Sequence, residues 1–305
     1  MKAYVRQMIP NRLKKWMRTK LHSRVSDRFD ELIEPYRRAK MTPFVDDCES
    51  NLARLRMHAH IIDKGLHRPD WQFGHGETCY SEAKRLLGKI TGFESDPTLV
   101  WADKVIREYE AAQKGVRHIS PESVFQQQTA VEPEYLKRFF CLRTTCRNFE
   151  EKAVSCEDLF SIIDAALQAS SSCCRQTLKV YGSVDPKIVR ETASCFSGFT
   201  GFSDFIPSAL VFCADIRSYY LPGELFAPTF DTALAADHAA LMAAAMGMSM
   251  GMLCWVPDSD RERRLRALHN IPEYETIVVG AVCGYPKQLA RKPPRKSAHE
   301  TLILT

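Results

Sequence analysis

Apolar residues recur at every fourth position near the start of the chain, the spacing of one face of an α-helix. The stripe consists of Ile9, Leu13, Met17, Leu21, Val25, Phe29 and Ile33. Pro10 and Asn11 stand where a helix would begin, and proline is favoured in the first turn of a helix. The pattern therefore predicts a long amphipathic helix within residues 1–40.

The helical spacing of apolar residues recurs after this stripe, as far as residue 114. Three further segments carry it: 46–66, 81–90 and 98–114. From His118 to Pro133 the chain is rich in Pro, Gln, Ser and Glu, which is typical of a linker. We therefore expect a helical N-terminal extension over residues 1–117, a linker over 118–133 and a second domain over 134–305.

The second domain mixes helical and strand patterns. Helices are predicted at 159–169, 186–197 and 231–246, and strands at 178–181, 208–215 and 276–285. The segment 231–246 is almost entirely Ala, Leu and Met, so we expect a helix that is buried on most sides. Because helices and strands alternate along the chain, this half belongs to the α+β or α/β class.

Composition and charge limit the environments that the protein can occupy. Its 305 residues are 45% hydrophobic and 26% charged, as in an ordinary globular protein, and no apolar run approaches the ~20 residues of a membrane span. The charged N-terminus argues against a cleaved secretory signal, so we expect a cytoplasmic protein. No nucleic-acid-binding motif is recognisable.

The positive charge is concentrated in the first segment. Residues 1–40 hold twelve Lys or Arg against four Asp or Glu, a net charge of +8, whereas the rest of the chain carries −3. A basic amphipathic helix of this kind fits the inner surface of an anionic membrane or an acidic partner. It could equally pack its apolar stripe on the second domain, and the sequence leaves both interpretations open.

The cysteines and histidines do not form a metal-binding pattern. The eleven cysteines are scattered and include no CxxC pair, and Cys141 and Cys146 lack a second pair. This usage indicates a reducing compartment with free thiols. His58 and His60 lie on different faces of a predicted helix and cannot share an ion. We therefore predict no metal site.

One short stretch concentrates groups that bind anions. Arg143 and Arg147 flank Thr144 and Thr145, so two guanidiniums and two hydroxyls fall within five residues. Guanidiniums bind phosphate oxygens in pairs of hydrogen bonds, and hydroxyls can fill the remaining positions. Ser155 follows shortly afterwards and can cap a helix, with Asp158 returning the hydrogen bond.

Four landmarks of the second half occur in the order found in the flavin-dependent nitroreductase family, which residues 140–305 resemble. Arg143–Phe149 is similar to the family's R-x-S-x-R-x-F, and Ser170–Gln176 to its P-S-S-x-N-x-Q turn. The helix from Asp231 to Ser249 resembles one that ends in G-L-G, with Cys254-Trp255 following. Gly284-Tyr285-Pro286, with the basic residues 291–296, resembles the closing G-Y-P and R-K-P.

The resemblance implies a fold, a cofactor and an assembly. It implies an α+β nitroreductase-like fold, with a central mixed or antiparallel sheet flanked by helices. It also implies bound FMN, reduced by NADH or NADPH, and a homodimer in which the polar turn reaches the partner subunit's flavin. The cofactor-binding residues expected from it are Arg143, Thr144, Thr145, Arg147, Ser170, Ser171, Ser172, Cys174, Leu253, Cys254, Trp255 and Arg295.

The resemblance names no catalytic side chain, because in this family the chemistry belongs to the flavin. If a side chain assists, Tyr219, Tyr220 and Cys254 are placed to do so, although both tyrosines could simply pack. The expected function is hydride transfer between a nicotinamide or other donor and a small organic substrate. A flavin dehydrogenase that uses oxygen as its acceptor is a further possibility within the same class.

Three departures from the family pattern keep another class of function open. Ser170 replaces the usual Pro, Cys174 the usual Asn and Ser249 the second Gly of G-L-G. They permit a flavin-binding scaffold protein with weakened catalysis. The segment His60–Leu66, followed by Phe73-Gly74, resembles an H-x-x-E-K-G-L…F-G extension of nitroreductase-like proteins of bacterial polysaccharide biosynthesis.

Overall fold

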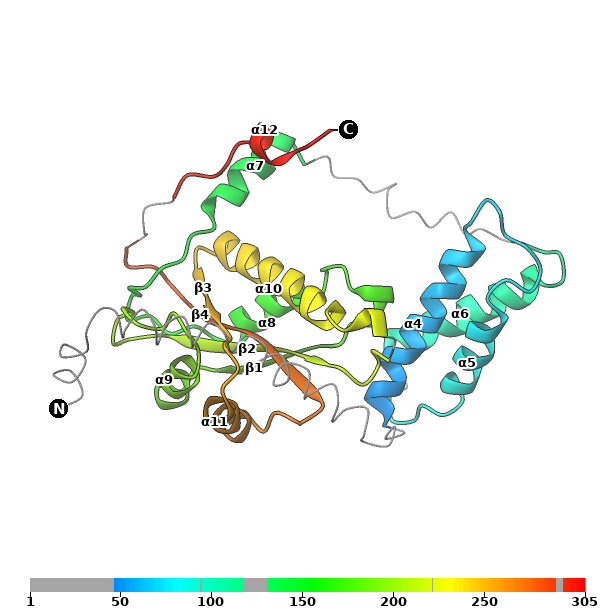
Figure 1. The fold of residues 1–305 in the computed structure, drawn as a ribbon, viewed down its shortest axis with the longest axis horizontal. Helices are drawn as coiled ribbons and strands as arrows, with labels where there is room; N and C mark the ends of the chain where they lie inside the picture. The colour runs from blue at the N-terminus through cyan, green and yellow to red at the C-terminus, as the bar shows by residue number, and fades with distance from the viewer. Residues whose placement is uncertain (1–46, 94, 118–130, 221, 289–292, 305) are drawn as a thin grey trace, which may run out of the picture.

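The computed structural model describes residues 47–93, 95–117, 131–220, 222–288 and 293–304. Figure 1 shows a group of helices beside a sheet that carries helices on both faces. The amphipathic helix predicted within residues 1–40 lies outside the described residues, as does most of the predicted linker.

Three helices form the first group, here named the helical unit. They are α4 (Cys48–Leu66), α5 (Glu77–Leu87) and α6 (Pro97–Ala112), and they pack around one apolar core. Asp47 caps α4 by accepting a hydrogen bond from the Glu49 backbone N–H at 2.8 Å. The three helices predicted between residues 46 and 114 are thus confirmed, with ends displaced by a few residues.

The sheet contains four strands among the described residues, in the order β1-β2-β4-β3, and every neighbouring pair is antiparallel. The strands are β1 (Leu178–Ser183), β2 (Ser208–Asp215), β3 (Ser249–Cys254) and β4 (Glu275–Gly284). This architecture confirms the α+β class and the three predicted strands. The prediction missed β3, whose Met and Leu residues continue the apolar composition of the preceding helix.

Helices cover both faces of the sheet (Figure 1). On one face lie α8 (Cys156–Ala166) and α10 (Ala227–Ala245), and on the other lie α9 (Pro186–Ser194) and α11 (Ser259–His269). The predicted cap of α8 is confirmed, because Ser155 and Asp158 exchange hydrogen bonds with each other's backbone N–H at 3.0 and 3.1 Å. The prediction did not include α11.

Helix α10 differs from the prediction in two respects. It begins at Ala227 rather than Asp231, with Pro228 in its first turn. Its alanines pack on the sheet, but the opposite side is open, with Phe230 66% and Leu234 50% exposed. The prediction that this helix is buried on most sides is therefore wrong for the single chain, because the sheet covers only one side of it.

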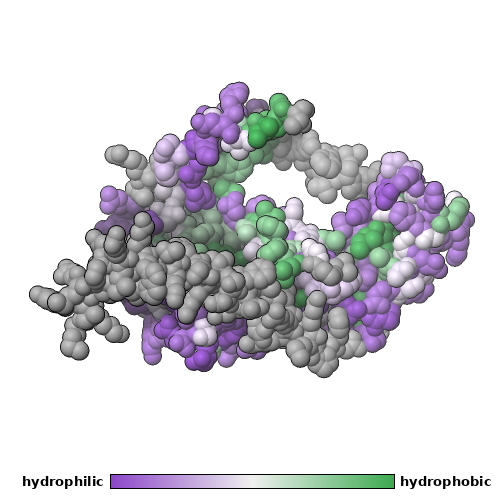
Figure 2. All heavy atoms as spheres, in the orientation of Figure 1, coloured by the Kyte–Doolittle hydropathy of each residue, from purple (hydrophilic) through white to green (hydrophobic). Residues whose placement is uncertain are grey.

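An outer arm extends from the sheet region (Figure 1). It consists of α7 (Pro133–Leu142), which the prediction missed, and the C-terminal segment with α12 (Ala298–Thr301). No residue of α7 is buried. Figure 2 shows apolar surface on this arm and over α10. None of the described helices is long and apolar enough to cross a membrane.

The helical unit contacts the sheet region through charged residues near its N-terminus. Arg217, at the end of β2, pairs with Asp47 and with Asp215, the latter at 2.6 Å. Lys179 on β1 pairs with Glu49 at 3.0 Å. Helix α4 also packs against the short 3-10 helix η2 (Ser172–Cys174).

Candidate functional site

The anion-binding stretch, here named the arginine segment (Arg143–Phe149), is held against the first residue of β3. Ser249 is 3% exposed, and its hydroxyl accepts a hydrogen bond from the Cys146 N–H at 2.8 Å. The same hydroxyl donates to the Thr144 carbonyl at 2.5 Å. One serine side chain therefore fixes the backbone in the middle of the segment.

The end of the arginine segment runs beside the chain that leaves β4. The Glu150 N–H donates to the Tyr285 carbonyl, and the Lys287 N–H donates to the Asn148 carbonyl, both at 2.9 Å. Gly284 permits this approach, because a Cβ at that position would lie 2.4 Å from Cγ of Pro207 and 3.0 Å from the Phe149 ring. With Ser249, which ends the third landmark, the structure thus brings together three of the four landmarks.

The two guanidiniums of the segment have no carboxylate partner among the described residues. Arg147 is exposed and lies over the Phe202 ring at 5.6 Å, and Arg143 is half-buried. Thr144 and Thr145 are also half-buried between them. Two cations beside hydroxyls on a fixed backbone are well suited to hold a phosphate or another anion.

The predicted third cation is not joined to this pair by any described contact. Arg295 is exposed in the outer arm, ahead of Ser297, which caps α12. Residues 291 and 292 of the predicted basic tail lie outside the described residues. Convergence of Arg143, Arg147 and Arg295 on one anion stays a prediction.

The second predicted group, here named the polar turn (Ser170–Gln176), has an unusual backbone. Cys173, Cys174 and Gln176 all adopt left-handed conformations, with φ of 51°, 56° and 53°. Each such residue carries a conformational cost of about 1–2 kcal/mol. Ser170 is exposed, whereas Ser171, Ser172 and Cys174 are half-buried. The surrounding structure must stabilise this conformation.

Asp231 supplies one restraint on the turn. Its carboxylate accepts hydrogen bonds from the Ser172 N–H and the Ser172 hydroxyl, both at 2.8 Å. It also accepts one from the Tyr219 hydroxyl at 2.8 Å, and that hydroxyl lies 2.9 Å from the Thr177 hydroxyl. Tyr219 is 6% exposed, and burial raises its pKa far above the usual range. Tyr219 is therefore a packed hydrogen-bond donor and a poor acid at neutral pH.

Arg175 supplies a second restraint from the other side. Its side chain is 1% exposed and pairs with Glu224 at 2.5 Å. It also donates to the Ser172 and Ser218 carbonyls at 3.2 Å. The prediction missed the roles of Arg175, Glu224 and Asp231, because their partners lie far away in sequence.

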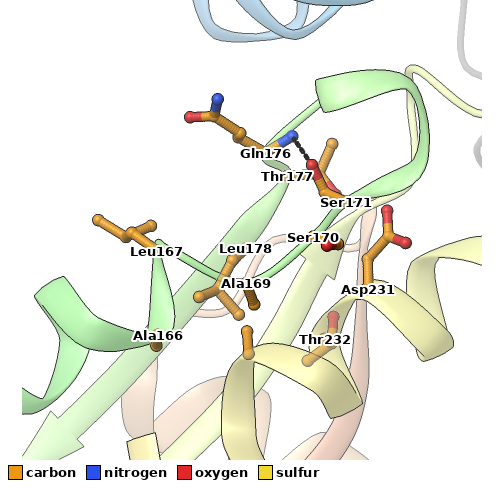
Figure 3. A pocket seen from close by; sticks show the side chains of 11 residues that line it. Ala166, Leu167, Ala169, Ser170, Ser171, Gln176, Thr177, Leu178, Asp231 and Thr232 are labelled. Carbon is orange, nitrogen blue, oxygen red and sulfur yellow. Dashed lines mark hydrogen bonds between the residues drawn. The ribbon is translucent and has the colours of Figure 1, made fainter. Parts of the chain in front are cut away.

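A small hollow lies between the polar turn, the end of α8 and the start of α10. Figure 3 shows Ser170, Ser171, Asp231 and Thr232 at its polar side, with the hydrogen bond from the Gln176 N–H to the Ser171 hydroxyl. Its volume is about 20 Å³, enough for one water molecule. The buried hydroxyl of Thr232 has no partner among the described residues.

The last predicted contacts lie at the end of β3. Leu253 is 2% exposed and belongs to the core, so only its backbone is available to a ligand. Trp255 is half-buried against Phe196, with ring centroids 5.4 Å apart. Cys254 is exposed, as is 38% of Tyr220. Among the predicted assisting side chains, Cys254 and Tyr220 are therefore the accessible ones.

The arginine segment and the polar turn lie at opposite ends of α10. Asp231, which holds the turn, is in the first part of the helix, and Ser249, which holds the arginine segment, follows its end. The 15 residues from Asp231 to Ala245 span about 22 Å of helix. A ligand bound at the arginine segment would have to extend over about this distance to reach the polar turn of the same chain.

An apolar groove of about 450 Å³ lies elsewhere, between α8 and the outer edge of β1. Its walls include Leu159, Phe160, Ile163, Val180 and Leu210, and Phe160 is 71% exposed. The prediction did not anticipate this groove, which contains none of the predicted site residues.

The described residues contain no group of three or more His, Cys, Asp or Glu that could hold a metal ion. His58 is 8% exposed, and its Nδ1 has no hydrogen-bond partner within the described part of the chain. Burial lowers the pKa of His58. Each cysteine of the described residues is a free thiol.

Comparison with known proteins gives relatives that match about half of the chain, although no family model matches. Over 157 residues the chain is 27% identical to a protein of Archaeoglobus fulgidus named NADH dehydrogenase/NAD(P)H nitroreductase, covering 50% of this chain and 86% of that protein. It is 24% identical over 165 residues to the FMN reductase (NADPH) of Bacillus subtilis, and the alignment covers 49% of this chain and 65% of that protein.

This chain was also aligned with a solved structure from Parabacteroides distasonis, named NADH dehydrogenase/NAD(P)H nitroreductase. The alignment covers 57% of this chain and 98% of the chain in that structure. Its TM-score is 0.49 and its sequence identity 21%. The sequence relatives confirm the resemblance of the chain to the nitroreductase family. They carry no information on polysaccharide biosynthesis.

Proposed function

We propose that this chain, whose second half is related to the nitroreductase family, is an FMN-dependent oxidoreductase. It would take a hydride from NADH or NADPH and deliver it to a small organic substrate. The relatives named NAD(P)H nitroreductase and FMN reductase support this class of reaction. The observation that carries the proposal is the pair Arg143 and Arg147, two cations held on a fixed backbone without a carboxylate partner among the described residues.

The residues of the arginine segment fit the phosphate end of FMN. Arg143 and Arg147 would bind its oxygens, and Thr144 and Thr145 would donate from their hydroxyls. Arg295 would add a third cation from the outer arm. FMN, when bound, supplies the hydride chemistry. The protein would then contribute binding and orientation, with the backbone at Leu253 and the side chains of Cys254 and Trp255 along the flavin ring.

Ser249 supports a firmly held cofactor site, which both the enzyme and the flavin-binding scaffold require. As a departure from the family pattern it suggested a weakened cofactor site, yet its hydroxyl makes two hydrogen bonds to the arginine segment. The substitution therefore reinforces the segment instead of loosening it. Oxygen is the alternative acceptor within the enzyme class.

The experiment is to purify the protein, denature it and measure the flavin released, and to titrate the apoprotein with FMN. Under argon, NADH or NADPH should bleach the bound flavin and air should restore it. Protein that carries no flavin and binds none when FMN is added would overturn the proposal. Flavin that binds but stays oxidised with both donors would favour the scaffold.

We propose further that the active form is a homodimer. The polar turn lies about 22 Å along α10 from the arginine segment of its own chain, so it would contact the flavin of the partner. Exposed apolar residues of α7, of α10 and just before α10 supply surface for such an interface: Tyr135, Leu136, Phe140, Phe226, Phe230 and Leu234.

Complementation between two variants tests this arrangement. Arg143→Ala impairs the arginine segment, and Asp231→Asn impairs the polar turn. If each flavin site combines the segment of one chain with the turn of the other, a mixed dimer regains one intact site. Tight binding of one FMN per mixed dimer is expected, whereas no gain over either parent would place both groups in one chain's site.

Two further proposals concern the structure and the membrane contact of the N-terminal part of the chain. We propose that residues 1–117 form a helical extension, joined to the second domain by residues 118–133, and that residues 1–40 bind the inner face of an anionic membrane. Binding to anionic but not neutral vesicles, lost on deletion of residues 1–40, would support this contact. Equal recovery in the supernatant with both lipids would contradict it.

The association with polysaccharide biosynthesis is also a proposal, supported by the resemblance of His60–Leu66. Two residues of this motif, Ile62 and Leu66, lie in the core of the helical unit, at 2% and 3% exposure. Loss of extracellular polysaccharide on deletion of the gene, restored by the wild-type chain, would support the association, and unchanged polysaccharide would contradict it.

A further inference from the structure

The polar turn has an unfavourable backbone conformation, and the proposed function requires this turn to be correctly oriented toward the flavin. Three of its non-glycine residues are left-handed. Such strain persists only where neighbouring structure imposes it. A neighbouring residue must therefore orient the surface of the turn that would contact a flavin.

Two restraints act on different parts of the turn. Arg175 points into the protein and ties the turn to Glu224 and to the Ser218 carbonyl. Asp231 approaches from the first part of α10 and binds both the N–H and the hydroxyl of Ser172. Arg175 therefore anchors the turn, whereas Asp231 fixes the rotation of the Ser172 peptide and the direction of its side chain.

The Asp231 carboxylate has a hydrogen-bond arrangement that an amide cannot reproduce. It accepts from three donors, two of which share Oδ2. An asparagine offers one acceptor oxygen, and its NH₂ group would face a donor. None of the described lysines, arginines or histidines forms an ion pair with this carboxylate, and its described contacts are these three hydrogen bonds.

We infer that Asp231 is a positioning residue for the flavin site: through Ser172, and supported by Tyr219, it sets the orientation of the polar turn toward the cofactor. The inference rests on the proposed function. It gives Tyr219 a supporting role through the carboxylate and not a role as an acid. In the hydrogen-bonded chain Tyr219–Asp231–Ser172, Tyr219 is buried, whereas Asp231 and Ser172 are half-buried, and Asp231 lines the hollow of Figure 3.

The test compares Asp231→Asn, Tyr219→Phe and Asp260→Asn in the full-length protein. Asp260 is exposed on α11, on the other face of the sheet, and serves as the control. The measurements are the dissociation constant for FMN, the melting temperature of the apoprotein, and alkylation of Cys173 and Cys174 resolved by peptide mass spectrometry. Asp231→Asn should weaken FMN binding at least tenfold and speed alkylation of the turn several-fold. Tyr219→Phe should give a smaller change, and Asp260→Asn none.

A purely structural role predicts a different result. It would lower the melting temperature of Asp231→Asn while the folded protein kept wild-type FMN affinity and wild-type alkylation rates, and this outcome would overturn the inference. If the wild-type protein binds no FMN, the proposed function fails. The alkylation rates then still decide whether Asp231 holds the turn, because they require no cofactor.

Discussion

The arginine segment and the polar turn use charge in opposite ways. At the turn, Arg175 is 1% exposed and is already paired with Glu224. In the arginine segment the cations are half-buried or exposed, and no described carboxylate pairs with them. The internal charges at the turn maintain its conformation, whereas the charges of the segment remain available to a ligand. Substitutions should therefore separate effects on stability from effects on binding.

The largest expected effect is on stability, at the turn. Arg175→Ala leaves Glu224 without its buried partner, and breaking such a pair costs about 3–5 kcal/mol of unfolding free energy. Denaturant unfolding measures the loss. Arg190→Ala is the control, because Arg190 and Asp204 form an exposed pair whose loss should cost less than about 1 kcal/mol. Equal effects of the two substitutions would show that the buried Arg175–Glu224 pair stabilises the protein no more than an exposed pair does.

A smaller effect, this time on binding, is expected at the arginine segment. Arg143→Ala should weaken FMN binding by about tenfold to a hundredfold, since a hydrogen bond to a charged group contributes about 1.5–3 kcal/mol. The unfolding free energy of the apoprotein should barely change. Lys187→Ala, an exposed substitution on α9, is the control for titration by fluorescence quenching. A large loss of apoprotein stability would show that Arg143 is structural.

Gly284→Ala should affect both properties, because the glycine lies where the arginine segment meets β4. The new Cβ would lie 2.4 Å from Cγ of Pro207, a ring that has little freedom to move. Overpacking of this kind costs about 1–3 kcal/mol. Calorimetry and FMN titration should both report the change, and Gly223→Ala, where nothing lies within 4 Å, is the control.

The smallest expected effect is the loss of stability at low pH that His58 causes in the helical unit. Burial lowers the pKa of His58 below its ordinary value of 6.5. The unfolded chain therefore binds more protons than the folded one below about pH 6.5, and stability should fall as the pH drops through that range. Arg54, Glu82, Arg85 and Arg175 act on this histidine. His58→Gln should flatten the pH profile of the unfolding free energy, while His75→Gln, in a loop, should leave it unchanged.

Local chemistry made much of the fold predictable. Ser155 and Asp158 are three residues apart, and their capping box is visible in the sequence. The run Ser208–Asp215 is predicted as a buried strand because its six inner residues, Ala-Leu-Val-Phe-Cys-Ala, are all apolar. The resemblance, in turn, predicts a cofactor site at the arginine segment, whose residues are contiguous in the sequence.

The support of the polar turn could not be predicted in the same way. Ser172 and Asp231 are 59 residues apart, and Arg175 and Glu224 are 49 apart. Asp231 and Glu224 look like ordinary surface carboxylates until the fold brings them to the turn. Strand β3 was missed for another reason, since its composition continues that of α10 and only Gly247, with φ of 74°, marks the break.

The pairing of β2 with β4 also has a consequence for biosynthesis. All eight residues of β2 are buried, and along one edge the strand pairs with residues 275–283, which are among the last of the sheet to be synthesised. The helical unit closes over short sequence distances and can form early, whereas pairing over long distances is slow. Until β4 is made, β2 presents an apolar strand with an unpaired edge, which is a template for aggregation. A chain truncated before residue 275 should therefore accumulate in inclusion bodies even though its helical unit is complete.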